Sequence, residues 1–63
     1  MITVNGTERD LLGSVGELVA VVTPERRGVA VAVNGEVVPR GEWDTCLLAD
    51  GDSVEILSAA QGG

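Results

Sequence analysis

The sequence predicts a single α+β domain, in which a mixed sheet of four to five strands packs on one main helix in the order β-β-α-β-β. Three observations predict this fold: an Asn5-Gly6 turn near the start, one capped amphipathic segment, and strand-like segments on both sides of it. A chain of 63 residues has room for one small core. We expect residues 1–58 to form the domain and residues 59–63 to form a flexible C-terminal tail.

The first expected element is a β-hairpin. Residues 1–5 place Ile2 and Val4 on one face of a strand. The Asn5-Gly6 pair that follows is a strong signal for a two-residue hairpin turn. A second strand is therefore expected from about residue 7 to residue 12.

A helix is expected next. Ser14 is a favourable N-cap, and Glu17 three residues later completes a capping box. One apolar stripe then follows the helical period at Val15, Leu18, Val19 and Val22. Pro24 ends the helix. Because Gly16 and the valines are weak helix formers, the helix should depend on packing against the sheet.

Residues 29–33 are five consecutive apolar residues, which favours a central strand buried on both faces over an edge strand. The valines of this segment share one face, which we place against the helix. Ala30 and Ala32 share the other face, where they would form a flat apolar strip on the open side of the sheet.

The remaining elements are short. Val37 and Val38 predict a short strand ended by Pro39, and residues 41–46 predict a single helical turn. Residues 49–53, built on Asp50-Gly51, predict a tight turn before the last strand.

The last strand is expected over residues 53–58. Val54 and Ile56 share one of its faces, and Glu55 and Leu57 share the other. A bulge would reverse these faces, so the sequence leaves open whether Leu57 belongs to the open side or to the core.

Composition and charge exclude several classes of function. The formal charge is −6, with four arginines and neither lysine nor histidine, so the chain repels nucleic acid and anionic membranes and favours a partner with a basic surface. No apolar run approaches the roughly 20 residues that cross a bilayer, and residues 1–10 do not resemble a signal peptide. With its single cysteine, the chain is expected to be cytoplasmic.

Candidate catalytic groups are few. Without histidine and with one cysteine, neither a Cys-His pair nor a common zinc site can be built. Asp50, Asp52 and Glu55 lack the spacing of a calcium loop and are interpreted as part of a solvated turn. Cys46 is interpreted as a small, partly buried side chain, and Trp43 as a core or lid residue rather than a partner anchor. We expect no catalytic residue, no metal and no bound cofactor.

The last two residues, Gly62 and Gly63, are the most informative feature. At 9 glycines in 63 residues, two glycines at two given positions have a chance of about one in 50. A glycine pair can lie extended in a channel too narrow for any other residue. A carboxylate is a poor electrophile until ATP converts it to an acyl-adenylate, and nothing in this chain can perform that step. The chain is therefore interpreted as the substrate of another protein.

Three segments, "VAVNGEVVPRGEW", "LADGDSVEIL" and the final "GG", resemble the sulfur-carrier protein family of thiamine biosynthesis, which has the ubiquitin-like β-grasp fold. The resemblance covers the whole chain. The Asp50-Gly51-Asp52 turn and the glycine pair are shared with relatives such as the small subunit of molybdopterin synthase. The "VPR…W" segment and the short length favour the thiamine branch.

The resemblance implies a sulfur carrier that is not itself an enzyme. A partner adenylating (E1-like) enzyme would consume ATP to activate Gly63, and a sulfur donor protein would supply the sulfur of a C-terminal thiocarboxylate. Thiazole synthase would then receive the sulfur. The partners would hold the tail and the open sheet face, which correspond here to Ala59, Ala60, Gln61 and Gly62 and to Ala30, Ala32 and Leu57.

Two alternatives stay open from the sequence. The same fold and chemistry could serve molybdopterin or cysteine synthesis, or a ubiquitin-like protein modifier. The chain could also be a plain binding or structural domain in which the terminal glycines are incidental.

Overall fold

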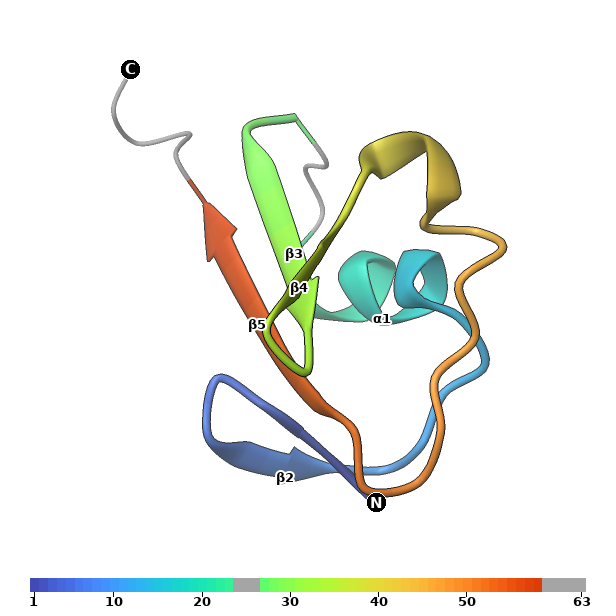
Figure 1. Ribbon diagram of the computed structural model, residues 1–63. Helices are drawn as coiled ribbons and strands as arrows, with labels where there is room; N and C mark the ends of the chain where they lie inside the picture. Colours follow the sequence, from blue (N-terminus) through green and yellow to red (C-terminus); the bar gives the residue numbers. More distant parts are fainter. Residues whose placement is uncertain (24–26, 59–63) are drawn as a thin grey trace.

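The computed structural model describes residues 1–23 and 27–58 (Figure 1). Within those residues the elements are β1 (Ile2–Val4), β2 (Thr7–Arg9), α1 (Val15–Val22), β3 (Val29–Val33), β4 (Glu36–Val38), a 3-10 turn (Arg40–Glu42) and β5 (Ser53–Ser58). The predicted order is confirmed, and the number of strands in the described part of the chain is five.

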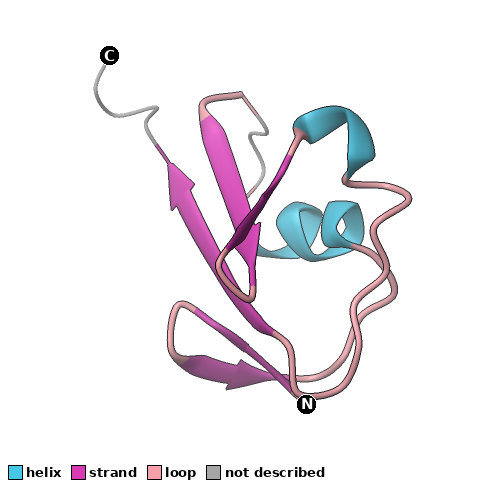
Figure 2. Cartoon of the chain, in the orientation of Figure 1, coloured by secondary structure: helices cyan, strands magenta, loops and turns pink. Residues whose placement is uncertain are grey.

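The strands form one mixed sheet in the order β2-β1-β5-β3-β4. The β1–β5 pair is parallel, and the other neighbouring pairs are antiparallel. Helix α1 lies across one face of this sheet (Figure 2). This arrangement is the predicted β-grasp fold, with β5, the last strand in the sequence, at its centre.

Both Asn-Gly pairs form the hairpin turns that connect neighbouring antiparallel strands. Asn5 and Asn34 have φ angles of 52° and 53°, and each is followed by a glycine with φ of 85°. Two successive positive φ angles define the turn that matches the twist of a hairpin. Strand β2 ends at Arg9 rather than near residue 12, because β1 offers only three residues for it to pair with.

Helix α1 begins with the predicted capping box. The Ser14 hydroxyl accepts from the Glu17 backbone N–H at 3.1 Å, and the Ser14 N–H donates to the Glu17 carboxylate at 3.1 Å. The N–H groups of Val15 and Gly16 donate to the carbonyls of Cys46 and Trp43. The segment that follows β4 therefore supplies hydrogen-bond acceptors for two backbone N–H groups in the first turn of the helix. The helix ends at Val22, and Pro24, the predicted stop, lies outside the described residues.

The core lies between α1 and the sheet. Trp43 is 1% exposed, and its indole N–H donates to the Val38 carbonyl at 2.9 Å, so it is a core residue as predicted. The other buried apolar residues are Ile2, Val4, Val15, Leu18, Val19, Val29, Val31, Leu48, Val54 and Ile56. The helical turn predicted for residues 41–46 begins one residue earlier, at Arg40.

One prediction about residues 29–33 is wrong. Strand β3 does lie between two other strands, and its valines face the core. It is not buried on both faces, because Ala30 is exposed on the side away from α1. A run of small apolar residues predicts the strand, but it does not reveal whether the chain has a second layer to cover it.

Among the described residues, no helix combines the length and the apolar character that crossing a membrane requires.

Candidate functional site

The candidate site is the sheet face that α1 leaves uncovered. Ala30 lies opposite Leu57, and Ala32 lies between Glu55 on one side and Val37 on the other. Side chains alternate between the two faces along each strand, and residues directly opposite each other on paired strands point to the same face. We call Ala30, Ala32, Val37 and Leu57 the open-face patch. Together with Glu55 and Val31 these residues line a shallow hollow of about 90 Å³.

The structure places Leu57 in this patch. Its pairing with Ala30 lies in a continuous register between β3 and β5, without a bulge. Leu57 is 71% exposed, whereas Ile56 beside it is 7% exposed. The alternative that Leu57 belongs to the core is therefore wrong, and the three predicted face residues Ala30, Ala32 and Leu57 lie together.

Val37 belongs to the same patch and was missed by sequence reasoning. It is also 71% exposed, directly across from Ala32. The signal was present in the sequence, because a two-residue turn at Asn34-Gly35 pairs Val33 with Glu36 and so Ala32 with Val37. Counting outward from the turn gives this register.

The open-face patch lies at the end of β5 that leads to the C-terminus. Leu57 is followed by Ser58, the last residue that the structure describes. The predicted tail residues Ala59, Ala60, Gln61, Gly62 and Gly63 lie outside the described residues, so their roles and the boundary at residue 58 stay predictions. Ser58, the last described residue, thus follows the patch residue Leu57 on the central strand of the sheet.

The opposite end of β5 carries a polar network. The Asp52 carboxylate accepts from the Ala49 N–H at 2.8 Å and from the Asn34 amide at 3.0 Å. These two hydrogen bonds, the Ala49 bond foremost, hold the pKa of Asp52 below its ordinary value, against a small opposing effect of burial. The network ties the 49–52 turn to the β3–β4 turn, so the interpretation of Asp50 and Asp52 as turn residues agrees with the structure.

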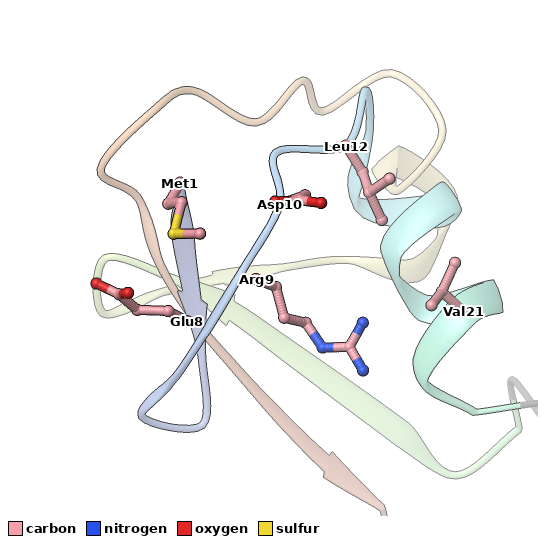
Figure 3. Close-up of a pocket in the computed structure, with 6 residues that line it drawn as sticks. All are labelled: Met1, Glu8, Arg9, Asp10, Leu12 and Val21. Atoms are coloured by element: carbon pink, nitrogen blue, oxygen red, sulfur yellow. The ribbon is translucent and has the colours of Figure 1, made fainter.

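A second depression, of about 420 Å³, lies between the first hairpin and α1 (Figure 3). Figure 3 shows the Arg9 side chain extending toward α1, with Glu8 on the other side of β2. Its lining residues are Met1, Glu8, Arg9, Asp10, Leu12 and Val21. No β3 or β5 residue is among them, so this depression does not join the open-face patch.

The described residues were also compared with the requirements of a metal site and of a reactive thiol. Residues 1–23 and 27–58 contain no group of three or more potential metal ligands. Cys46 is a free, half-buried cysteine packed against the core, as expected for a structural side chain. Within the described residues, the candidate site is therefore an exposed apolar patch on the sheet rather than a cavity lined with reactive side chains.

Comparison with known proteins gives consistent results. The sequence model of the ThiS family matches residues 2–63. The sulfur carrier protein ThiS of Escherichia coli (strain K12) is 32% identical over 50 residues, which cover 79% of this chain and 76% of that protein.

Solved structures agree with the sequence relatives. The crystal structure of a thiamine biosynthesis protein (ThiS) from Geobacter metallireducens has a TM-score of 0.73 and 39% identity, and the match covers 90% of each chain. An NMR solution structure of a thiamine biosynthesis protein from the same organism has a TM-score of 0.71 and 36% identity, covering 89% of this chain and 78% of the other.

Proposed function

The chain belongs to the ThiS family, and from this membership we propose that it acts as a sulfur carrier in thiamine biosynthesis whose terminal glycine, Gly63, bears the sulfur. The observation that carries the proposal is the extent of the family match. It runs to residue 63 and so includes the Gly62-Gly63 pair.

The chemistry follows from the weakness of a carboxylate as an electrophile. The Gly63 carboxylate attacks the α-phosphate of ATP, pyrophosphate leaves, and an acyl-adenylate forms. A sulfur nucleophile such as hydrosulfide then attacks the acyl carbon. A C–S bond forms, the C–O bond to AMP breaks, and AMP leaves with the electron pair, which yields the thiocarboxylate. The chain has no histidine or lysine to catalyse these steps, so they are assigned to an adenylating partner enzyme.

The tail has the dimensions that delivery requires. Residues 59–63 span at most about 17 Å at roughly 3.3–3.6 Å per residue. That length is enough for Gly63 to enter a partner's active site while the domain stays outside. Without a Cβ atom, Gly62 and Gly63 fit a narrow channel in which other residues would clash.

The open-face patch is the surface that the partners would contact. Leu57 and Val37 are large apolar side chains exposed on one face, which is typical of a binding surface when they adjoin further apolar residues. Leu57 lies one residue before Ser58, the last described residue, so we expect a protein that binds the patch to be well placed to receive Gly63. The net charge of −6 favours a basic partner surface around this contact. The adenylating enzyme, the sulfur donor protein and thiazole synthase would each need access to Gly63.

The proposal is tested by pyrophosphate release with the cognate adenylating enzyme and ATP. The full chain should support release, and a chain lacking Gly63 should not. Circular dichroism and thermal unfolding should be the same for both, because Gly63 comes five positions after the last residue of β5 and belongs to none of the described strands. Equal release from the truncated chain would overturn the proposal.

The acceptor is tested separately. The thiocarboxylated chain is offered to thiazole synthase with its other substrates, and in parallel to the large subunit of molybdopterin synthase. Sulfur should appear in the thiazole product. Transfer only in the parallel reaction would assign the carrier to the other pathway.

A further inference from the structure

The two Asn-Gly turns share a feature that hairpin formation does not require. Asn5 and Asn34 each direct a side-chain amide at the main chain of β5. The Asn5 amide oxygen accepts from the Ile56 N–H at 2.9 Å, and the Asn5 amide nitrogen donates to the Ile56 carbonyl at 3.1 Å. The Asn34 amide oxygen accepts from the Ser53 N–H at 3.0 Å. The two asparagines thus hold opposite ends of the same strand.

Asn5 replaces a missing strand residue. β1 pairs with β5 in parallel only at Thr3 and Val4, and the Asn5 N–H then donates to the Val54 carbonyl at 2.9 Å. Beyond that point the chain turns into β2. The Asn5 side chain supplies the donor and the acceptor that a further β1 residue would have offered to Ile56. It therefore extends the hydrogen bonding on this side of β5 to within two residues of Ser58.

This contact lies on the last part of β5, the strand that precedes the tail in the sequence. Without the Asn5 amide, the end of β5 would be held by β3 alone, through the pairs at residues 56–58. β5 carries Leu57 of the open-face patch and precedes the tail in the sequence, so loosening of its end would alter how the patch and the start of the tail are presented to a partner.

We propose that Asn5 is a positioning residue for the delivery of Gly63, because its amide holds the end of β5 in place on the side away from β3. This inference rests on the proposed function. Asn5 does not touch the reacting atoms, so it acts on productive docking of the carrier rather than on the chemical step. Loss of the amide should raise the KM for the carrier and leave kcat nearly unchanged.

The test compares Asn5→Gly with Asn34→Gly in the full chain. Glycine adopts the positive φ of both positions without strain, so each variant removes side-chain hydrogen bonds and leaves the turn possible. Steady-state pyrophosphate release is measured against carrier concentration with the cognate adenylating enzyme. Asn5→Gly should raise KM about fivefold, because the net free energy of one hydrogen bond corresponds to a factor of about five in an equilibrium constant. Asn34→Gly should leave KM and kcat within about twofold, because its bonds lie at the far end of β5.

Hydrogen exchange reports the same contact without the enzyme. The Ile56 amide should exchange faster in Asn5→Gly, and the Ser53 amide should exchange faster in Asn34→Gly. The fluorescence of buried Trp43 confirms that each variant folds. If Asn5→Gly does not fold, Asn5→Asp serves in its place, since it keeps the acceptor for the Ile56 N–H and loses only the donor.

The outcomes separate the two proposals. Equal KM values for the two variants, with an active wild-type chain, overturn the role of Asn5 alone. An effect of Asn5→Gly confined to kcat also overturns it. Absence of pyrophosphate release from the wild-type chain overturns the proposed function, and the role of Asn5 with it.

Discussion

The two faces of the sheet are built from the same strands, yet they differ in almost every property. On the face toward α1, Ile56 is buried among large apolar side chains and Trp43. On the opposite face, its neighbour Leu57 is exposed, and no described residue covers it. In the part of the chain that the structure describes, one α-helix covers one face of the sheet, so the buried contacts that stabilise the fold lie on that face. The other face keeps an exposed apolar patch that the core does not include, and this patch is the surface that we propose for partner binding.

The largest effect is expected on the covered face, at Trp43. Trp43→Ala removes the largest buried side chain and its hydrogen bond to the Val38 carbonyl. Such truncations cost about 3–5 kcal/mol of unfolding free energy. The whole stability of a chain of this size is about 3–9 kcal/mol. Urea unfolding measures the loss, with Trp43→Phe as the milder control. A loss under about 1 kcal/mol would contradict the burial of the indole.

Ile56 and Leu57 are adjacent in β5 but lie on opposite faces of the sheet. Truncating each of them therefore gives the closest comparison of what the two faces contribute to the unfolding free energy. Ile56→Ala should lower the unfolding free energy by about 2–5 kcal/mol, because it leaves a cavity in the core. Leu57→Ala should change it by less than about 0.5 kcal/mol, because the removed atoms are mostly in solvent. Thermal or urea unfolding of the two variants decides the point. Equal losses would mean that the two faces do not differ in their contribution to folding.

Substitutions on the open face should instead weaken partner binding. Leu57→Asp and Val37→Asp each introduce a charge into the open-face patch. We expect each to weaken binding of the adenylating enzyme about tenfold or more, with little change in stability. Ala20→Asp is the matched control, since it adds the same charge at an exposed position of α1. Calorimetric titration that shows the same affinity for all three variants would exclude this face as the contact.

The smallest effect concerns Asp52. Because its pKa is lower in the folded chain than the ordinary 3.8, its contribution is fully present above about that pH and is lost as the pH falls through the folded pKa. The unfolding free energy should therefore decline below about pH 3.8. Asp52→Asn should flatten this part of the pH profile in acid unfolding experiments. An unchanged profile would show that the bonds from Ala49 and Asn34 do not stabilise the carboxylate in solution.

Local patterns predicted much of the fold and part of the site. The Asn5-Gly6 hairpin and the Ser14–Glu17 capping box depend on residues close in sequence, and both have the expected geometry. The alternation of β5 placed Leu57 on the open face once a continuous register was established.

The remaining features depend on contacts between distant segments. Asn5 and Ile56 are 51 positions apart in the sequence. No local sequence pattern predicts that the side chain of an asparagine in a turn will form a hydrogen bond with a distant strand. Gly16 was interpreted only as a weak helix former. In the structure, a Cβ atom at Gly16 would collide with the Asp44 carboxylate, so glycine leaves room for that side chain beside the helix. The extent of burial around β3 likewise depends on which elements exist to cover it.

The central claim is that the helix-covered face maintains the fold, so that the open-face patch and Gly63 can serve a partner. Intact-mass and tandem mass spectrometry of the full chain, after incubation with the cognate adenylating enzyme, ATP and sulfide, test it most directly. The predicted result is a mass gain equal to the exchange of one oxygen for one sulfur, located at Gly63. An unchanged mass with an enzyme of proven activity, or sulfur found at Cys46 instead, would contradict it.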